Sequence, residues 1–147
     1  MNRPIAAAVA LFGLLASFVA PVRAEVTAEQ VRRAIHRGVS YLLAQQRDDG
    51  AWPEMSGYRG GVGALCTLAL LNAGVEANDR RMQKALNYLR TIPPEKTYVV
   101  ALQTMVFARA EPDRDRKLIL RNVEWLEGTQ VVKGPFKGAW TYPDNRG

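Results

Sequence analysis

Apolar residues recur three or four positions apart in three segments of the chain, residues 27–46, 79–91 and 112–129. Most Lys and Arg side chains of these segments fall between the apolar positions. Such spacing predicts amphipathic helices that bury one stripe and expose the opposite face. The stripe of the first segment is Val31, Ile35, Val39 and Leu42. Thr27 and Gln30 have the spacing of a capping box, which fixes the start of that helix.

Two further segments, residues 62–73 and 97–110, are dominated by apolar residues. The first carries no charge and the second carries a single Arg, and each is too short to span a membrane. A helix of this kind must be buried on all sides. The regular alternation with the amphipathic segments predicts an all-α fold with two layers, an outer amphipathic layer and an inner apolar layer. No segment has the pattern of a strand.

The first 24 residues have the pattern of a secretory signal peptide. Arg3 supplies a positive start, residues 5–20 are uncharged, and Ala24 precedes the predicted cleavage site before Glu25. We therefore expect an exported protein, periplasmic or secreted, that meets the membrane only through this peptide. An uncleaved membrane anchor is the alternative. The domain expected to remain after cleavage comprises residues 25–147.

Composition and charge narrow the possible partners. The chain has 147 residues, 48% of them hydrophobic, and a net charge of +6. Cleavage would remove Arg3 and Arg23 and leave 18 basic and 14 acidic residues, a net charge of +4. That charge is too small to indicate nucleic-acid binding. The single Cys and the single His do not form a metal-ligand cluster, so we expect neither a metal nor another cofactor.

The amphipathic segments share a repeated pattern of a basic residue, a small residue, two others, an aromatic residue and Leu. Its copies are residues 37–42, 84–89 and 121–126, with Asn122 in the small position of the third. A repeat of about 40 residues with two helices per unit is typical of helical arrays. After the first and third copies, a Gln is followed by Gly-Ala-Trp. These residues are Gln46, Gly50 and Trp52, and Gln130, Gly138 and Trp140.

This combination resembles the QW motif of the squalene–hopene cyclase and terpenoid cyclase superfamily, and the repeat is similar to the prenyltransferase and squalene oxidase repeat. The residues that match are Arg37, Gly38, Tyr41, Leu42, Gln46, Gly50, Trp52, Gln130, Gly138 and Trp140. The resemblance implies an α/α toroid of paired inner and outer helices, of which this chain would form an incomplete arc. For the motif itself we expect a structural role, namely to staple neighbouring repeats together.

Few residues of the sequence indicate a catalytic function. The acidic Asp-x-Asp-Asp motif of class II cyclases does not occur, and residues 113–115 are expected to lie exposed at a helix start. Polar residues of the apolar helices could line a lumen or bond between helices; they are Thr67, Asn72, Gln103 and Thr104. We therefore expect no catalysis from this chain as it stands.

Three functions remain open from the sequence. The first is an exported binding or scaffold module, a fragment of a longer protein with an unknown ligand or protein partner. The second is a fragment of a toroid-fold enzyme, either a terpene or squalene cyclase or a polysaccharide lyase, whose catalytic half lies elsewhere. The third is a self-associating arc that closes a ring between copies.

Overall fold

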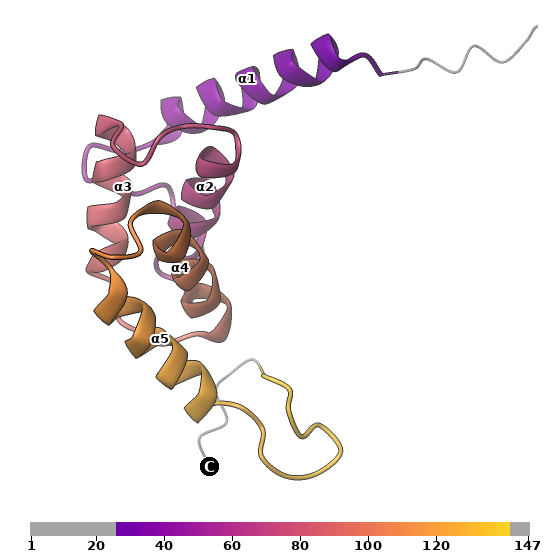
Figure 1. Ribbon diagram of the computed structural model, residues 1–147, viewed down its shortest axis with the longest axis vertical. Helices are drawn as coiled ribbons and strands as arrows, with labels where there is room; N and C mark the ends of the chain where they lie inside the picture. The colour runs from indigo at the N-terminus through magenta and orange to yellow at the C-terminus, as the bar shows by residue number, and fades with distance from the viewer. Residues whose placement is uncertain (1–25, 142–147) are drawn as a thin grey trace, which may run out of the picture.

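Five helices make up the ordered elements of the computed structural model, which describes residues 26–141 (Figure 1). They are α1 (Ala28–Gln45), α2 (Gly61–Asn72), α3 (Arg80–Arg90), α4 (Thr97–Ala110) and α5 (Arg116–Gly128). No residue between 26 and 141 belongs to a strand. The predicted all-α class is therefore confirmed. The predicted signal peptide and its cleavage site at Ala24–Glu25 lie outside the described residues.

The local signals set four of the five helix starts close to where the sequence placed them. Thr27 and Gln30 form the complete capping box, each bonding to the backbone of the other. The carboxylate of Asp79 accepts hydrogen bonds from the first backbone N–H groups of α3. The start of α5 was predicted wrongly, because residues 112–115 form a turn and the helix begins only at Arg116.

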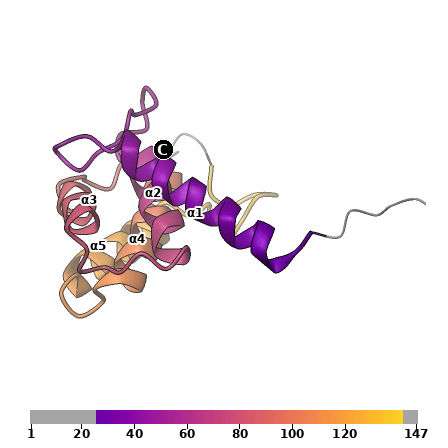
Figure 2. The same cartoon turned by 90° about the horizontal axis from the view of Figure 1, so that it is seen from above.

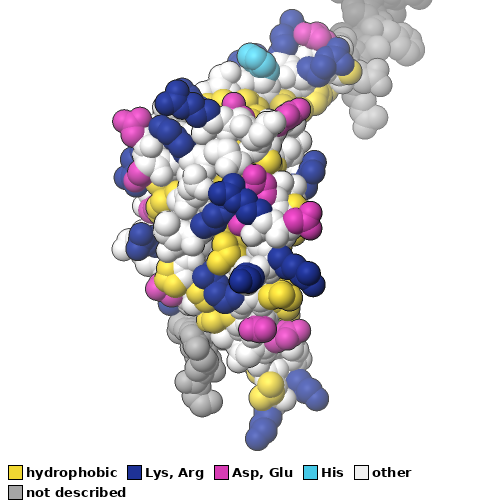
Figure 3. Space-filling view, turned by 60° about the vertical axis from the view of Figure 1, so that its left-hand side comes forward, with side chains coloured by type: hydrophobic (Ala, Val, Ile, Leu, Met, Phe, Trp, Pro, Cys, Tyr) yellow, Lys and Arg dark blue, Asp and Glu magenta, His cyan; other side chains and the backbone are white. Residues whose placement is uncertain are grey.

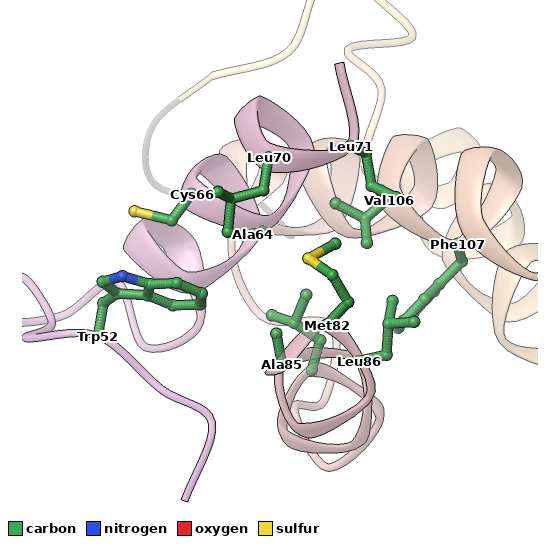
Figure 4. Packing of buried hydrophobic residues seen from close by; sticks show 11 residues of the cluster. Trp52, Ala64, Cys66, Leu70, Leu71, Met82, Ala85, Leu86, Val106 and Phe107 are labelled. Carbon is green, nitrogen blue, oxygen red and sulfur yellow. The ribbon is translucent and has the colours of Figure 1, made fainter. Parts of the chain in front are cut away.

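The core lies where α2, α3, α4 and α5 meet. Helix α2 packs along α4, α3 packs against α2, and α5 packs against α4. Met82 and Leu86 project from α3 toward the apolar helices, and Phe107 of α4 lies beside them (Figure 4). All three side chains are almost completely buried. The amphipathic helices α3 and α5 thus lie on one side and the apolar helices on the other (Figure 1).

Helix α1 is set apart from this core. It buries none of its residues completely, and it reaches the core only through its C-terminal half, where Val39, Leu42 and Leu43 are partly buried. Seen from above, its N-terminal half extends away from the other helices (Figure 2). Its apolar stripe is consequently half-open, with Ile35 48% exposed.

The apolar helices are not buried on all sides, which corrects the expectation from their sequences. Leu65 of α2 and Met105 of α4 are 49% and 55% exposed. Leu68 and Asn72 of α2 line a shallow, mostly apolar hollow together with Met105. Helices α2 and α4 therefore pack against each other and against the outer layer, and they leave one apolar face open.

Two buried polar groups connect the ends of the outer helices to the core. Gln103 of α4 donates hydrogen bonds to the carbonyls of Leu89 and Ile92, 3.0 and 3.3 Å away, and so satisfies the C-terminal end of α3. Its own carbonyl oxygen accepts from Asn122 of α5 at 3.2 Å. Both side chains are fully buried. The repeat's small position therefore holds an Asn in α5 because that residue bonds to α4.

An ion cluster explains the late start of α5. Arg90, at the end of α3, bonds to both carboxylate oxygens of Asp115 and to Glu111. Asp115 is 2% exposed, so the expectation that residues 113–115 lie exposed at a helix start is wrong for this residue. Because its carboxylate is held by Arg90, the chain turns once more before α5 begins.

No helix in the described part of the chain is long and apolar enough to cross a membrane.

The ion cluster makes stability depend on pH. Burial alone would raise the pKa of Glu111, but hydrogen bonds from Arg90 and Gln83 and the positive charge of Arg90 lower it overall. A lowered pKa means that the stabilisation is complete above the ordinary glutamate pKa and is lost as the pH falls through the folded-state value. We predict that Glu111→Gln costs about 1–2 kcal/mol of unfolding free energy at neutral pH. This loss of unfolding free energy should become smaller as the pH falls from the ordinary glutamate pKa through the lowered pKa of Glu111.

Urea unfolding at a series of pH values measures this difference. Glu76→Gln is the matched control, because Glu76 is exposed and forms no ion pair among residues 26–141. Equal curves for the two variants would contradict a stabilising role for the cluster.

Candidate functional site

The first Gln-Gly-Trp motif joins the loop after α1 to helix α3. The side-chain amide of Gln46 donates to the carbonyl of Gly50 at 3.1 Å and to the carbonyl of Arg81 in α3 at 3.0 Å. In return, the Arg81 guanidinium donates to the carbonyl of Leu43 at the end of α1. Trp52 is 2% exposed and donates from its indole nitrogen to the carbonyl of Leu42 at 2.8 Å. Loop and helix are therefore linked in both directions.

Gly50 is required at this joint for two reasons. Its φ of 88° lies in the left-handed region, which favours glycine. A Cβ atom at Gly50 would also lie only 2.3 Å from the carbonyl oxygen of Lys84, so the loop touches the backbone of α3 directly.

The second motif repeats this internal geometry. The Gln130 amide donates to the carbonyl of Gly138 at 2.9 Å, and the Trp140 indole donates to the carbonyl of Leu126 at 2.7 Å. Gly138 has a φ of 89°, but nothing lies within 4 Å of where its Cβ would be. Trp140 is 44% exposed. The loop of the second motif therefore has the same hydrogen bonds as the loop of the first, but no described helix covers it.

The remaining motif residues of α1 have weaker roles in this part of the chain. Arg37 and Gly38 are exposed, and Tyr41 is 65% exposed. Leu42 is partly buried against the core and supplies the carbonyl that Trp52 bonds. The hydrogen bonds and close backbone contacts of the first motif thus come mainly from its Gln, Gly and Trp residues.

The four polar residues proposed to line a lumen lie in different surroundings. Thr67 and Thr104 donate hydrogen bonds to carbonyls four residues earlier in their own helices. Thr67 and Gln103 are fully buried, whereas Asn72 is exposed and borders the hollow beside Met105. Whether any of them faces a lumen stays a prediction.

A basic hollow of about 280 Å³ lies beside the first motif. It is lined by Gln46, Arg47, Asp48, Arg80, Arg81 and Lys84. Arg47 lies 3.7 Å from Asp49 in an exposed ion pair, whereas the side chains of Arg80 and Lys84 form no ion pair among residues 26–141. Four cations and one acidic residue therefore surround a space that water and small groups can enter. On the face drawn in Figure 3, Lys and Arg side chains in dark blue alternate with Asp and Glu side chains in magenta.

Sequence reasoning missed this hollow. It treated Arg80, Arg81 and Lys84 as outward-facing residues of an amphipathic helix. What gathers them with Arg47 is the Gln46 bond to Arg81, which brings the start of α3 to the end of α1. Two features of the sequence could have predicted the hollow. They are the first Gln-Gly-Trp motif and the three cations among the first five residues of α3. A larger hollow of about 390 Å³ between α1 and the turn after α2 is mostly apolar, so it does not select for charge.

Potential acid–base groups elsewhere are held in their protonated forms. Tyr88 donates to Glu54 at 3.2 Å, and Glu54 also accepts the backbone N–H of Val62 at the start of α2. Burial and the neighbouring Glu54 carboxylate raise the pKa of Tyr88, and the same two causes raise the pKa of the buried Cys66 thiol. Neither side chain is therefore activated as a base or nucleophile. Among residues 26–141, no group of three His, Cys, Asp or Glu side chains could hold a metal.

Of the comparisons with known proteins, the one with protein-family models gives a match. The family model described as pectic acid lyase matches residues 15–145, which is most of the chain. No curated protein and no solved structure matches this chain. The resemblance to squalene–hopene cyclases, terpenoid cyclases and the prenyltransferase and squalene oxidase repeat is therefore wrong as an assignment. The motif residues link the loop after α1 to α3 and to the end of α1, so likeness at these positions indicates how helices are joined and does not identify a reaction.

The two glycines of the motif provide a test of the joint. Gly138→Ala should cost about 1–2 kcal/mol, because only the left-handed backbone is strained. Gly50→Ala should cost at least about 3 kcal/mol, because the same strain is added to a clash with the Lys84 carbonyl. Urea unfolding of both variants measures the difference. If the two substitutions cost the same, α3 does not press on the loop as described.

Proposed function

The chain belongs to the pectic acid lyase family, and we propose that it forms part of an exported polysaccharide lyase that acts on pectic acid. The family match is the observation that carries this proposal. Two features of the chain support it. Pectic acid is a polymer of sugar acids, which a protein meets outside the cell, and the first 24 residues have the pattern of an export signal. The hollow beside the first motif is basic.

A lyase acting on such a polymer needs positive charge at the substrate carboxylate. In an elimination, a base removes the proton from the carbon that bears the carboxylate, a C=C bond forms, and the bond to the glycosidic oxygen breaks. The leaving oxygen then takes up a proton. Negative charge grows on the carboxylate during proton removal, so fixed cations stabilise that step. We assign no catalytic base within residues 26–141.

The cations of the basic hollow suit the binding of sugar carboxylates. Arg presents a planar fork of donors that pairs with a carboxylate through two parallel hydrogen bonds, and Lys acts as a compact charge. Arg80 and Lys84 are one helical turn apart on α3 and are free of ion pairs within the described residues. The Asp48 carboxylate at the same hollow can accept hydrogen bonds from sugar hydroxyls. We propose that this surface holds the polysaccharide through its carboxylates.

The closed toroid belongs to the same proposal. The two layers of helices and the repeated joint support a ring built from further helical hairpins. In that arrangement the open apolar face of α2 and α4 would be turned toward the interior of the ring. The described helices would then form one part of that ring.

Binding to polygalacturonate tests the role of the basic hollow. We predict that the double variant Arg80→Ala, Lys84→Ala raises the Kd for polygalacturonate roughly five- to tenfold at low salt, with a smaller effect at high salt. The matched control is Arg116→Ala, Lys117→Ala, which removes two exposed cations from α5. Isothermal titration calorimetry measures both. An equal loss in the control, or equal affinity for a neutral polysaccharide, would contradict binding at this hollow.

The reaction class is tested separately on the natural exported protein. Incubation with polygalacturonate should produce new chain ends that absorb in the ultraviolet, because elimination leaves a C=C bond conjugated to the carboxylate. Chain cleavage without that absorbance would show hydrolysis and would contradict the lyase proposal.

A further inference from the structure

We propose that Arg59 and Tyr88 form a second subsite for an acidic sugar, and that the polysaccharide runs to this subsite from the basic hollow along helix α3. The chain would then bind several consecutive sugar residues and favour long galacturonate oligomers over short ones. This inference rests on the proposed function, because it requires that the bound polymer carries a carboxylate on its sugars. It adds a direction and a dependence on chain length to the binding that the basic hollow provides.

The loop between α1 and α2 follows α3 from its first turn to just past its end. Two of the contacts between them are hydrogen bonds and two are close approaches of loop glycines. In chain order these pairs are Gln46 with Arg81, Gly50 with Lys84, Glu54 with Tyr88, and Gly60 with Ile92. The successive partners on the α3 side are three or four residues apart, so the contacts lie on one side of that helix. A ligand that enters at the basic hollow can therefore follow the border between loop and helix.

Three side chains of α3 line this course. Arg80, Lys84 and Tyr88 are each four residues apart and so lie on the same side of the helix. Arg80 and Lys84 line the basic hollow, and Tyr88 lies one turn farther on, against the loop at Glu54. Eight residues of helix span about 12 Å, which is longer than one sugar ring. A polymer held by its carboxylates at Arg80 and Lys84 therefore reaches Tyr88 only if it has several sugar residues.

Arg59 adds a cation at the Tyr88 end of this course. Its side chain is hydrogen-bonded to the Tyr88 hydroxyl, which itself donates to Glu54 at 3.2 Å. Arg59 is exposed and forms no ion pair among residues 26–141. A guanidinium has five N–H donors, so a hydroxyl that holds one of them leaves others for a ligand carboxylate. The tyrosine therefore positions the arginine without neutralising it.

The neighbouring groups leave the charge of Arg59 available. The two carboxylate oxygens of Glu54 accept from the Tyr88 hydroxyl and from the backbone N–H of Val62, 3.3 Å away, and Glu54 forms no ion pair with Arg59. Burial and the Glu54 carboxylate raise the pKa of Tyr88, although the bond from Arg59 opposes that rise. The Tyr88 hydroxyl consequently stays neutral at neutral pH and does not repel a sugar carboxylate.

Binding of galacturonate oligomers of defined length tests the inference. The dimer is too short to reach Arg59 from the basic hollow, whereas the hexamer can occupy both subsites. We expect the natural-length chain to bind the hexamer at least about tenfold more tightly than the dimer. Arg59→Gln should weaken hexamer binding roughly three- to fivefold and dimer binding less. Isothermal titration calorimetry measures the hexamer, and NMR titration measures the weaker dimer.

Two further variants show whether the effect arises at this subsite. Arg109→Gln is the matched control, because Arg109 is an exposed cation of α4 that forms no ion pair in the described part of the chain. It should leave hexamer binding unchanged. Tyr88→Phe removes the hydroxyl that positions Arg59, so it should weaken hexamer binding. Adding it to Arg59→Gln should cause no further loss, because the hydroxyl acts through Arg59. Circular dichroism checks that each variant is folded.

Two results would overturn the second subsite alone. One is equal hexamer affinity of the natural-length chain and Arg59→Gln, while polygalacturonate binding still depends on Arg80 and Lys84. The other is an equal loss in Arg109→Gln, which would show that overall charge and not position sets the affinity. Absence of binding by every galacturonate oligomer would contradict the proposed function, and the inference with it. The two failures are therefore distinguishable.

Discussion

One side-chain amide links two successive outer helices of this fold, α1 and α3. Gln46 donates one hydrogen bond to its own loop, at Gly50, and another to the backbone of the next outer helix, at Arg81. Helix α1 buries no residue completely, so its attachment depends on this joint, on Trp52 and on the half-buried side chains of its C-terminal half. The Arg81 guanidinium completes the link by bonding to the carbonyl of Leu43. The same contact creates the basic hollow, because it draws the cations of α3 toward the end of α1.

The sequence predicts most of the helices, but it predicts little of the surfaces and sites that form where those helices meet. Periodicity and the Thr27 capping box are local, so the helices and most of their ends could be predicted. The start of α5 could not, because Asp115 pairs with Arg90, 25 residues away in sequence. Burial of α2 and α4 on all sides was a false expectation, since Leu65 and Met105 lie on a face that no described helix covers. The basic hollow likewise forms only when α1 and α3 meet.

The motif also explains why the family could be mistaken from the sequence. A Gln that reaches a neighbouring carbonyl, a Gly that allows close approach and a Trp that covers apolar surface solve a packing problem common to helical repeats. Resemblance at these residues therefore indicates a way of joining helices and does not identify a reaction. The match to the pectic acid lyase family is the ground on which the lyase activity is proposed, and the exposed cations of the described part are compatible with a polyanionic substrate.

The two Gln-Gly-Trp motifs form the same joint, which α3 contacts at Gln46 and no described helix contacts at Gln130. Urea unfolding of the Gln46→Ala and Gln130→Ala variants compares the two joints. Gln46→Ala should cost about 1–3 kcal/mol, because it removes the bonds to both the Gly50 and the Arg81 carbonyls and loosens α1 from α3. Gln130→Ala should cost less than about 1 kcal/mol, because it removes only the bond to Gly138 within an exposed loop. Equal losses in the two variants would contradict the account.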